Sequence, residues 1–179
     1  MPPIKRVNKE KILDTAFDIV RESGMKSLNT RLIAKKLNCS TQPIFSEYKN
    51  MNELKKELKE KICNYHEKYL CQNLDINHSY RTTGENYIRF AKEEPNLFNA
   101  IFADEKIDES EDYGNVIKEA QVSTGLDEKE AISFHKIMWF YTHGIATLVA
   151  NNTIKLTDEQ IQELLGIEFK ALMLLEGKK

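Results

Sequence analysis

The sequence is poor in residues that interrupt regular structure. It has only 7 glycines and 4 prolines in 179 residues, and apolar residues recur at helical spacing along most of the chain, whereas strand-like alternation is hard to find. No apolar run is long enough to cross a bilayer. The longest, residues 137–150, spans 14 residues and contains His143 and two threonines. These absences predict an all-α fold and no association with a membrane.

Motifs of common enzyme classes are also missing. The chain contains no GxSxG, P-loop, GxGxxG or HExxH. Cys63 and His66 lie three residues apart on one helical face, with Cys71 two turns further on, but two ligands make no metal site. The odd number of cysteines and the lack of a CxxC pair are typical of reduced thiols, although a redox switch at Cys39 stays open. We therefore expect a protein that is not an enzyme and has no metal and no cofactor.

The net charge of −2 is distributed unevenly along the chain. Residues 1–62 carry a net charge of +6 and residues 63–179 a net charge of −8. A basic N-terminal part joined to an acidic body is typical of a nucleic-acid-binding domain followed by a domain that does not bind nucleic acid. The first residues, MPPIKRVNKEK, lack the apolar core of a signal peptide, so we expect a cytoplasmic protein.

Capping residues and apolar periodicity predict about nine helices. Asn8 caps the first, which stops at Gly24 in a left-handed conformation, and Asn29 caps the second. Ser40 opens a short third helix with Pro43 in its first turn. The other predicted elements are helices over 52–71, 83–93, 97–102 and 113–123 and an acidic loop over 104–112. A further helix begins with a capping box at Asp127–Glu130 and ends near Asn151. The last begins with a capping box at Thr157–Gln160 and ends near Gly177.

The second and third helices, joined by a tight turn at Asn38 and preceded by a longer helix, form a helix-turn-helix arrangement. In that motif the second short helix enters the major groove of DNA. Its exposed face offers hydroxyl and amide groups that can reach bases or phosphates, from Ser40, Thr41, Gln42 and Ser46. Arg31 and Lys49 flank this face and are placed to bind the DNA backbone. The alternative is a packing unit of the same shape with no role in DNA binding.

The stretch NKEKILDTAFDIVRESGMKSLNTRLIAKKLNCSTQPIFSEYKNMNELKKEL resembles the N-terminal domain of the TetR family of transcriptional regulators. The matching features are ILDTAF in the first helix, Gly24 at its end, TRLIAKKLN in the second helix and YKNMNEL before the fourth. Phe45 stands where the family often has a tyrosine that bonds a phosphate, and Glu47 would repel phosphate if it pointed toward DNA. A helical interaction module without DNA affinity is therefore the alternative. The resemblance implies that the DNA contacts are Thr30, Arg31, Thr41, Gln42, Phe45, Ser46 and Lys49.

Two strongly apolar helices close the chain. The segment FHKIMWFYTHGIATLVANN is apolar nearly all the way round a helix, and such a helix must be buried on most sides. Two such helices from each of two chains predict a four-helix bundle and a homodimer, in agreement with the resemblance, because TetR-type regulators generally dimerise through their last two helices. The alternative is that both apolar stripes are core within one chain. The stripe of the final helix consists of Ile161, Leu164, Leu165, Phe169, Leu172 and Met173.

Trp139, His143 and Gly144 resemble the W…HG signature of one TetR C-terminal subclass, supported by YIRFAKEEPNLFNAIF before them. His143 is either a hydrogen-bonded core histidine or a polar group that lines an effector pocket. The other candidates for such a pocket are Tyr87, Phe90, Phe98, Phe102, Met138, Trp139 and Phe140. The sequence thus predicts a DNA-binding domain over 1–50 and a dimerisation and sensing domain over 51–179. We expect a repressor that leaves a palindromic operator when a small apolar or amphipathic effector binds.

Overall fold

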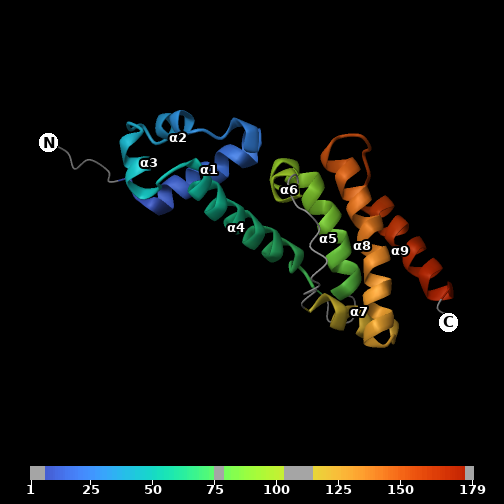
Figure 1. Cartoon of the computed structure of the whole chain (residues 1–179). Helices are drawn as coiled ribbons and strands as arrows, with labels where there is room; N and C mark the ends of the chain where they lie inside the picture. Colours follow the sequence, from blue (N-terminus) through green and yellow to red (C-terminus); the bar gives the residue numbers. More distant parts are fainter. Residues whose placement is uncertain (1–6, 75–78, 103–114, 176–179) are drawn as a thin grey trace. The chain divides into compact units, whose positions relative to one another are not determined.

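The computed structural model describes residues 7–74, 79–102 and 115–175, and within these ranges it consists of α-helices, one short 3-10 helix and no strand (Figure 1). The all-α prediction is confirmed. The acidic loop predicted over 104–112, the helix start at Tyr113 and the helix end at Gly177 lie outside the described residues. The helices are α1 Lys9–Ser23, η1 Met25–Ser27, α2 Thr30–Lys36, α3 Gln42–Glu47, α4 Met51–Leu70, α5 Ser79–Glu93, α6 Pro95–Phe102, α7 Val116–Thr124, α8 Glu128–Ala150 and α9 Asp158–Leu175.

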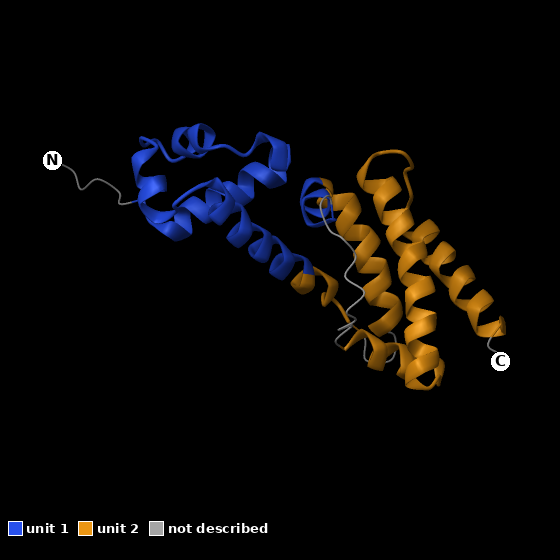
Figure 2. Ribbon diagram, viewed as in Figure 1, with its two compact units in different colours: residues 1–66, 96–105 blue, residues 67–95, 106–179 orange. Residues whose placement is uncertain are grey.

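The helices form two compact units (Figure 2). Unit 1 contains Met1–His66 and Asn96–Glu105, and unit 2 contains Glu67–Pro95 and Lys106–Lys179. Helix α4 therefore contributes to both units, and most of α6 belongs to unit 1 although it follows α5 directly in the chain. None of the described helices combines the length and the apolar character that a membrane span requires.

Local capping explains the helix ends in unit 1. The Asn8 side chain accepts a hydrogen bond from the Lys11 N–H at 3.1 Å, and the Asn29 side chain accepts one from the Leu32 N–H at 2.9 Å, as predicted. Asn38 has a φ of 50° in the turn after α2. Gly24 has the positive φ that was predicted, 77°, but its ψ of 165° is extended instead of helical. The chain leaves Gly24 directly into η1, so no left-handed turn forms there.

Helix α3 begins at Gln42, two residues later than predicted. The first carbonyl that its N–H groups use is that of Thr41, which accepts from Ile44 at 3.2 Å and from Phe45 at 3.3 Å. Pro43 is consequently the second residue of the helix, where its missing N–H leaves no hydrogen bond unmade. Ser40 and Thr41 lie in the turn ahead of α3, and not on the helix itself.

A buried tyrosine and a buried histidine connect α4 to the rest of unit 1. The Tyr48 hydroxyl donates to Glu57 at 3.0 Å, and Glu57 also pairs with Lys9 of α1. His66 is 9% exposed, and its ring packs edge-on against Phe102 of α6. The fully buried aliphatic side chains of unit 1 include Ile12, Ile19, Ile33, Ile44, Leu54, Leu58 and Ile62.

The burial of His66 predicts a loss of stability in acid. Desolvation lowers the pKa of His66 from 6.5 to about 4. Below pH 6.5 the unfolded chain takes up a proton here that the folded protein does not, so the contribution to stability is full above pH 6.5 and declines as the pH falls toward 4. We expect His66→Gln to remove about 3 kcal/mol of this decline. Urea unfolding at pH 7 and pH 4.5 measures it, and an unchanged pH dependence would contradict the prediction.

In unit 2, α5 packs against α7, α8 and α9, and α8 also packs against α7 and α9 (Figure 1). Helix α5 begins at Ser79, four residues before the predicted start. Tyr80 in its first turn is buried and packs against the rings of Phe134 and Phe169. This tertiary packing outweighs the weak helix propensity of residues 82–84.

Both predicted capping boxes are confirmed. At the start of α8, the Asp127 side chain accepts from the Glu130 N–H at 2.9 Å and the Glu130 side chain accepts from the Asp127 N–H at 3.0 Å. At the start of α9, Thr157 and Gln160 exchange the same pair of bonds, at 3.3 and 2.9 Å. These reciprocal bonds satisfy N–H groups that have no partner inside the helix.

A buried amide joins the end of α4 to α5 within unit 2. The Asn86 side chain is 1% exposed. Its NH₂ group donates to the carbonyl of Leu70 at 2.9 Å and to that of Gln72 at 2.8 Å, and its oxygen accepts from Arg89 at 2.9 Å. These carbonyls belong to the end of α4 and the turn after it, where no helical N–H is available to them.

Candidate functional site

The side chains predicted to contact DNA all reach the surface of unit 1. Arg31 in the first turn of α2, Gln42 and Ser46 on α3, and Lys49 after α3 are exposed, as is Ser40. Thr30 and Thr41 are half-buried. The backbone N–H of Lys49 donates to the Glu53 carboxylate at 2.7 Å. This bond ties the segment after α3 to the first turn of α4.

Helix α3 buries one face and exposes the other. Ile44 is 1% exposed, whereas Phe45 is 53% exposed and Glu47 is also exposed. A large apolar ring that the fold leaves in solvent is a candidate contact for a partner. Phe45 has no hydroxyl, so it cannot hydrogen-bond a phosphate. It can offer only apolar contact, for example to a thymine methyl.

The cysteines and possible metal ligands do not form a site in the described part of the chain. Cys39 and Cys63 are half-buried and Cys71 is exposed, and none of the three forms a disulfide. No three His, Cys, Asp or Glu side chains gather among the described residues. The described geometry therefore gives us no basis for metal or disulfide chemistry.

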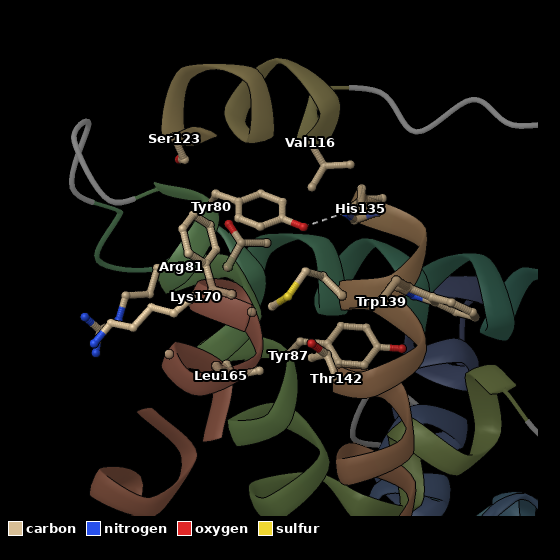
Figure 3. Close-up of a pocket in the computed structure, with 15 residues that line it drawn as sticks. Tyr80, Arg81, Tyr87, Val116, Ser123, His135, Trp139, Thr142, Leu165 and Lys170 are labelled. Atoms are coloured by element: carbon tan, nitrogen blue, oxygen red, sulfur yellow. Dashed lines mark hydrogen bonds between the residues drawn. The ribbon is translucent and has the colours of Figure 1, made fainter. Parts of the chain in front are cut away.

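Unit 2 contains a cavity of about 450 Å³ between α5, α7, α8 and α9 (Figure 3). This volume lies in the range of small-molecule sites. Most of the lining surface is apolar, with a few hydroxyl groups, one imidazole and two cationic side chains. The lining residues are Tyr80, Arg81, Thr83, Gly84, Tyr87, Val116, Ser123, His135, Met138, Trp139, Thr142, Leu165, Gly166, Phe169 and Lys170.

A neutral hydrogen-bonded pair lies in the lining. The Tyr80 hydroxyl and His135 Nδ1 are 3.1 Å apart, joined by the dashed line in Figure 3. Burial lowers the pKa of His135 to about 4 and raises the pKa of Tyr80. Both groups are consequently uncharged at neutral pH. Among the described lining residues, the formal charges at neutral pH come from Arg81 and Lys170 alone.

The predicted pocket residues separate into two groups. Tyr87, Met138 and Trp139 line the cavity. His143 is not a lining residue, but it contacts two of them: its Nδ1 is 2.8 Å from the Tyr87 hydroxyl, and its ring stacks on Trp139 with centroids 5.0 Å apart. Burial lowers the pKa of His143 as well.

The other predicted pocket residues do not line the cavity. Phe90 is fully buried and packs edge-on against Tyr69. Phe98 and Phe102 lie on α6 in unit 1, where they pack against each other. Phe140 is 60% exposed, on a different face of α8. Helical spacing placed these aromatic residues on apolar helix faces, but it could not show which residues each ring packs against.

One part of the cavity lining had a signal that the prediction overlooked. On α8 the lining residues are spaced i, i+3, i+4 and i+7, so they share one face, and His135 and Thr142 put polar groups on that face beside Met138 and Trp139. Polar groups on a buried apolar face often indicate a cavity. The lining residues of α9 have no comparable signal, because Leu165 and Phe169 also fit an ordinary core stripe.

Helices α8 and α9 expose apolar side chains away from the cavity. On α8, Ile137, Phe140 and Leu148 are 46%, 60% and 43% exposed, and Gly144 is exposed on the same face. A Cβ added at Gly144 would meet no atom within 4 Å. On α9, the large exposed apolar residues are Ile167, Leu174 and Leu175. We refer to Ile137, Phe140, Gly144, Leu148, Ile167 and Leu174 as the exposed apolar face.

Residues 80–172, more than half of the chain, match the family described as the tetracyclin repressor-like C-terminal domain. The chain belongs to the TetR family of transcriptional regulators. The predicted family is confirmed, and with it the function of a DNA-binding transcriptional regulator. The matched residues include the whole cavity lining. TetR-family regulators bind DNA operators and dimerise.

Solved structures of TetR-type regulators have a similar fold. A TetR-like regulator from Rhodococcus sp. RHA1 aligns with a TM-score of 0.61 at 19% identity, over 98% of this chain and 99% of that one. A single-residue variant of TetR from Acinetobacter baumannii, solved in complex with minocycline, aligns with a TM-score of 0.59 at 16% identity, over 96% and 97%. A TetR-family regulator from Haemophilus influenzae gives 0.59 at 18%, over 90% and 94%. The search of curated proteins found no match.

Proposed function

We propose that this TetR-family regulator is a cytoplasmic homodimeric repressor that leaves a palindromic operator when a small apolar or amphipathic molecule occupies the cavity of unit 2. The observation that carries the proposal is the cavity itself: about 450 Å³, lined largely by apolar groups and formed within the segment that matches the family. The minocycline complex of the Acinetobacter protein supports it, since a chain of this fold holds a small molecule. The chain acts in this proposal by binding and not by catalysis.

For the operator, we propose that residues 1–50 form the DNA-binding domain. Helix α3 enters the major groove, with Gln42 and Ser46 at base edges, Phe45 in apolar contact, and Arg31 and Lys49 on phosphates. All five side chains are exposed, and the α3 face opposite them is buried in unit 1. The remaining contacts are Thr30, Ser40 and Thr41, next to the starts of α2 and α3.

A selection from random DNA followed by binding at several salt concentrations tests this assignment. We expect enrichment of one palindromic sequence with salt-sensitive affinity. Arg31→Ala should weaken operator binding and reduce the slope of log affinity against log salt by about 2, because a dimer loses two phosphate contacts. Lys129→Ala is the matched control, since it removes an exposed cation from unit 2.

The slope separates the possible outcomes of this experiment. If the slope of log affinity against log salt were the same for Arg31→Ala and Lys129→Ala, Arg31 would not contact the DNA backbone. No enriched sequence at all would favour a protein-interaction role for unit 1, for which the exposed Glu47 is the supporting feature.

For the dimer, we propose that α8 and α9 of two chains form a four-helix bundle through the exposed apolar face. Five large apolar side chains on this face are at least 43% exposed in the single chain, and burying them is the driving force. Gly144 lies among them without a side chain, which allows the partner helix to approach closely. A two-fold dimer is also what a palindromic operator requires.

For release, the effector must bind more tightly to a conformation in which the two DNA-binding domains are wrongly spaced for successive major grooves. Trp139 is the only tryptophan of the chain and lines the cavity, so its fluorescence reports occupancy. Screened compounds that change this fluorescence should also lower operator affinity. A compound that saturates the fluorescence change and leaves operator affinity unchanged would contradict the release mechanism.

A further inference from the structure

The charges of the cavity lining are all of one sign. Arg81 on α5 and Lys170 on α9 line the cavity, whereas no aspartate or glutamate is among its described lining residues. Figure 3 shows both side chains extending to one side of the cavity, with Trp139 on the other side. The cavity thus combines a largely apolar interior with a cationic end.

Arg81 is held in position by a buried acid. Its Nε donates to Glu85 Oε1 at 2.8 Å, one turn further along α5, and Glu85 Oε2 accepts from Gln162 of α9 at 3.2 Å. Glu85 is 8% exposed. Because Nε makes the bond to Glu85, the donors on the two Nη atoms are directed elsewhere, and a guanidinium presents such donors in a fixed geometry that suits a carboxylate.

Lys170 adds a second positive charge to the lining. It is exposed and makes no ion pair within the described ranges. One more acid lies near the cavity: Glu119 of α7 hydrogen-bonds Thr83, and burial raises the pKa of Glu119. Glu119 is not a lining residue. The lining therefore favours a negative group on the side of the cavity to which Arg81 and Lys170 extend.

We propose that the effector is an amphipathic organic anion, whose carboxylate is bound by Arg81 and Lys170 and whose apolar part fills the cavity between Tyr80, Met138 and Trp139. This inference rests on the proposed function of the cavity and specifies the chemical class of its ligand. Charge-assisted hydrogen bonds to a carboxylate are worth about 1.5–3 kcal/mol, which corresponds to roughly a ten- to hundredfold preference for an acid over an alcohol of the same length.

Binding of decanoate and of 1-decanol to the full-length protein, followed by Trp139 fluorescence, tests the inference. We expect decanoate to bind at least about tenfold more tightly than decanol. Lys170→Gln should weaken decanoate about tenfold and leave decanol unchanged, and Arg81→Gln together with Lys170→Gln should make the two ligands equal. Lys118→Gln, which removes an exposed cation of α7 outside the lining, is the matched control.

Each outcome separates this inference from the proposed function. Equal affinities of decanoate and decanol for the unaltered protein would overturn the anionic class and leave the effector cavity in place. No fluorescence change with either ligand would overturn both. The assignment to Arg81 and Lys170 would also be overturned if the double variant still bound decanoate more tightly than decanol. The same holds if Lys118→Gln abolished this preference as completely as the double variant does. Lys170→Gln alone keeps the test valid if Arg81→Gln disturbs the buried Glu85.

Discussion

Replacing Phe140 with aspartate should convert the protein from a dimer into a monomer. Phe140 belongs to the exposed apolar face and is 60% exposed in the single chain. Aromatic residues at the centre of an interface commonly contribute about 2 kcal/mol or more, and a carboxylate in their place would be buried without a partner. We expect the dimer dissociation constant to rise by a factor of about 100 or more. Sedimentation velocity at micromolar concentration measures it.

The matched control for this substitution is Val122→Asp. Val122 is 77% exposed on α7 and is not part of the exposed apolar face, so its replacement adds the same charge at a site where no interface is proposed. Gly144→Arg supplies an independent test, because the single chain leaves open space at Gly144 and should fold normally. Its long side chain would still separate the two copies of α8. If both Phe140→Asp and Gly144→Arg remain dimeric, the dimer uses another surface.

Replacing Phe90 with alanine should destabilise the protein by about 3–5 kcal/mol. The Phe90 side chain is 0% exposed, and its ring packs edge-on against Tyr69 with centroids 5.3 Å apart. Alanine would leave a void that rigid helices on all sides cannot close. Urea unfolding measures the loss. The folded fraction of the variant should still bind cavity ligands with unchanged affinity, because Phe90 does not line the cavity.

Phe45→Ala is the control for this second substitution. Phe45 is 53% exposed, so its removal should change stability by no more than about 0.5 kcal/mol. We expect it to lower operator affinity instead, since α3 presents this ring to DNA in the proposed complex. A Phe90→Ala variant as stable as Phe45→Ala would contradict the packing around α5. A change in ligand affinity without a change in stability would place Phe90 at the cavity after all.

How well a feature could be predicted depended on how local its cause is. The caps at Asn8 and Asn29 and the turn at Asn38 were predictable, because each involves a side chain or backbone angle within three residues of the helix end. The start of α5 was not, because Tyr80 is drawn into the helix by Phe134 and Phe169, which are distant in the sequence. The same turn of α5 carries Arg81 and Thr83, so the prediction missed these lining residues together.

The cavity could be predicted only in part for a related reason. Periodicity shows that a helix has an apolar face, and it identified Tyr87, Met138 and Trp139. It does not show which faces of α5, α7, α8 and α9 meet around a space, since that depends on how the helices pack. Phe98 and Phe102 show the limit clearly. They follow α5 closely in the chain but belong to unit 1.

The Asn86 side chain gives the end of α4 a fixed attachment to α5. Its two N–H donors and its oxygen are all engaged and the Asn86 side chain is buried, so a shift of Leu70 and Gln72 against α5 would leave buried donors of Asn86 without a partner, at a cost of about 1–3 kcal/mol for each group left unsatisfied. The next residue of α5, Tyr87, lines the cavity. A ligand that displaces α5 at Tyr87 would therefore carry the last turn of α4 with it. Movement at the ligand would thus reach the end of α4 through Asn86 and through Tyr69, which packs against Phe90 of α5.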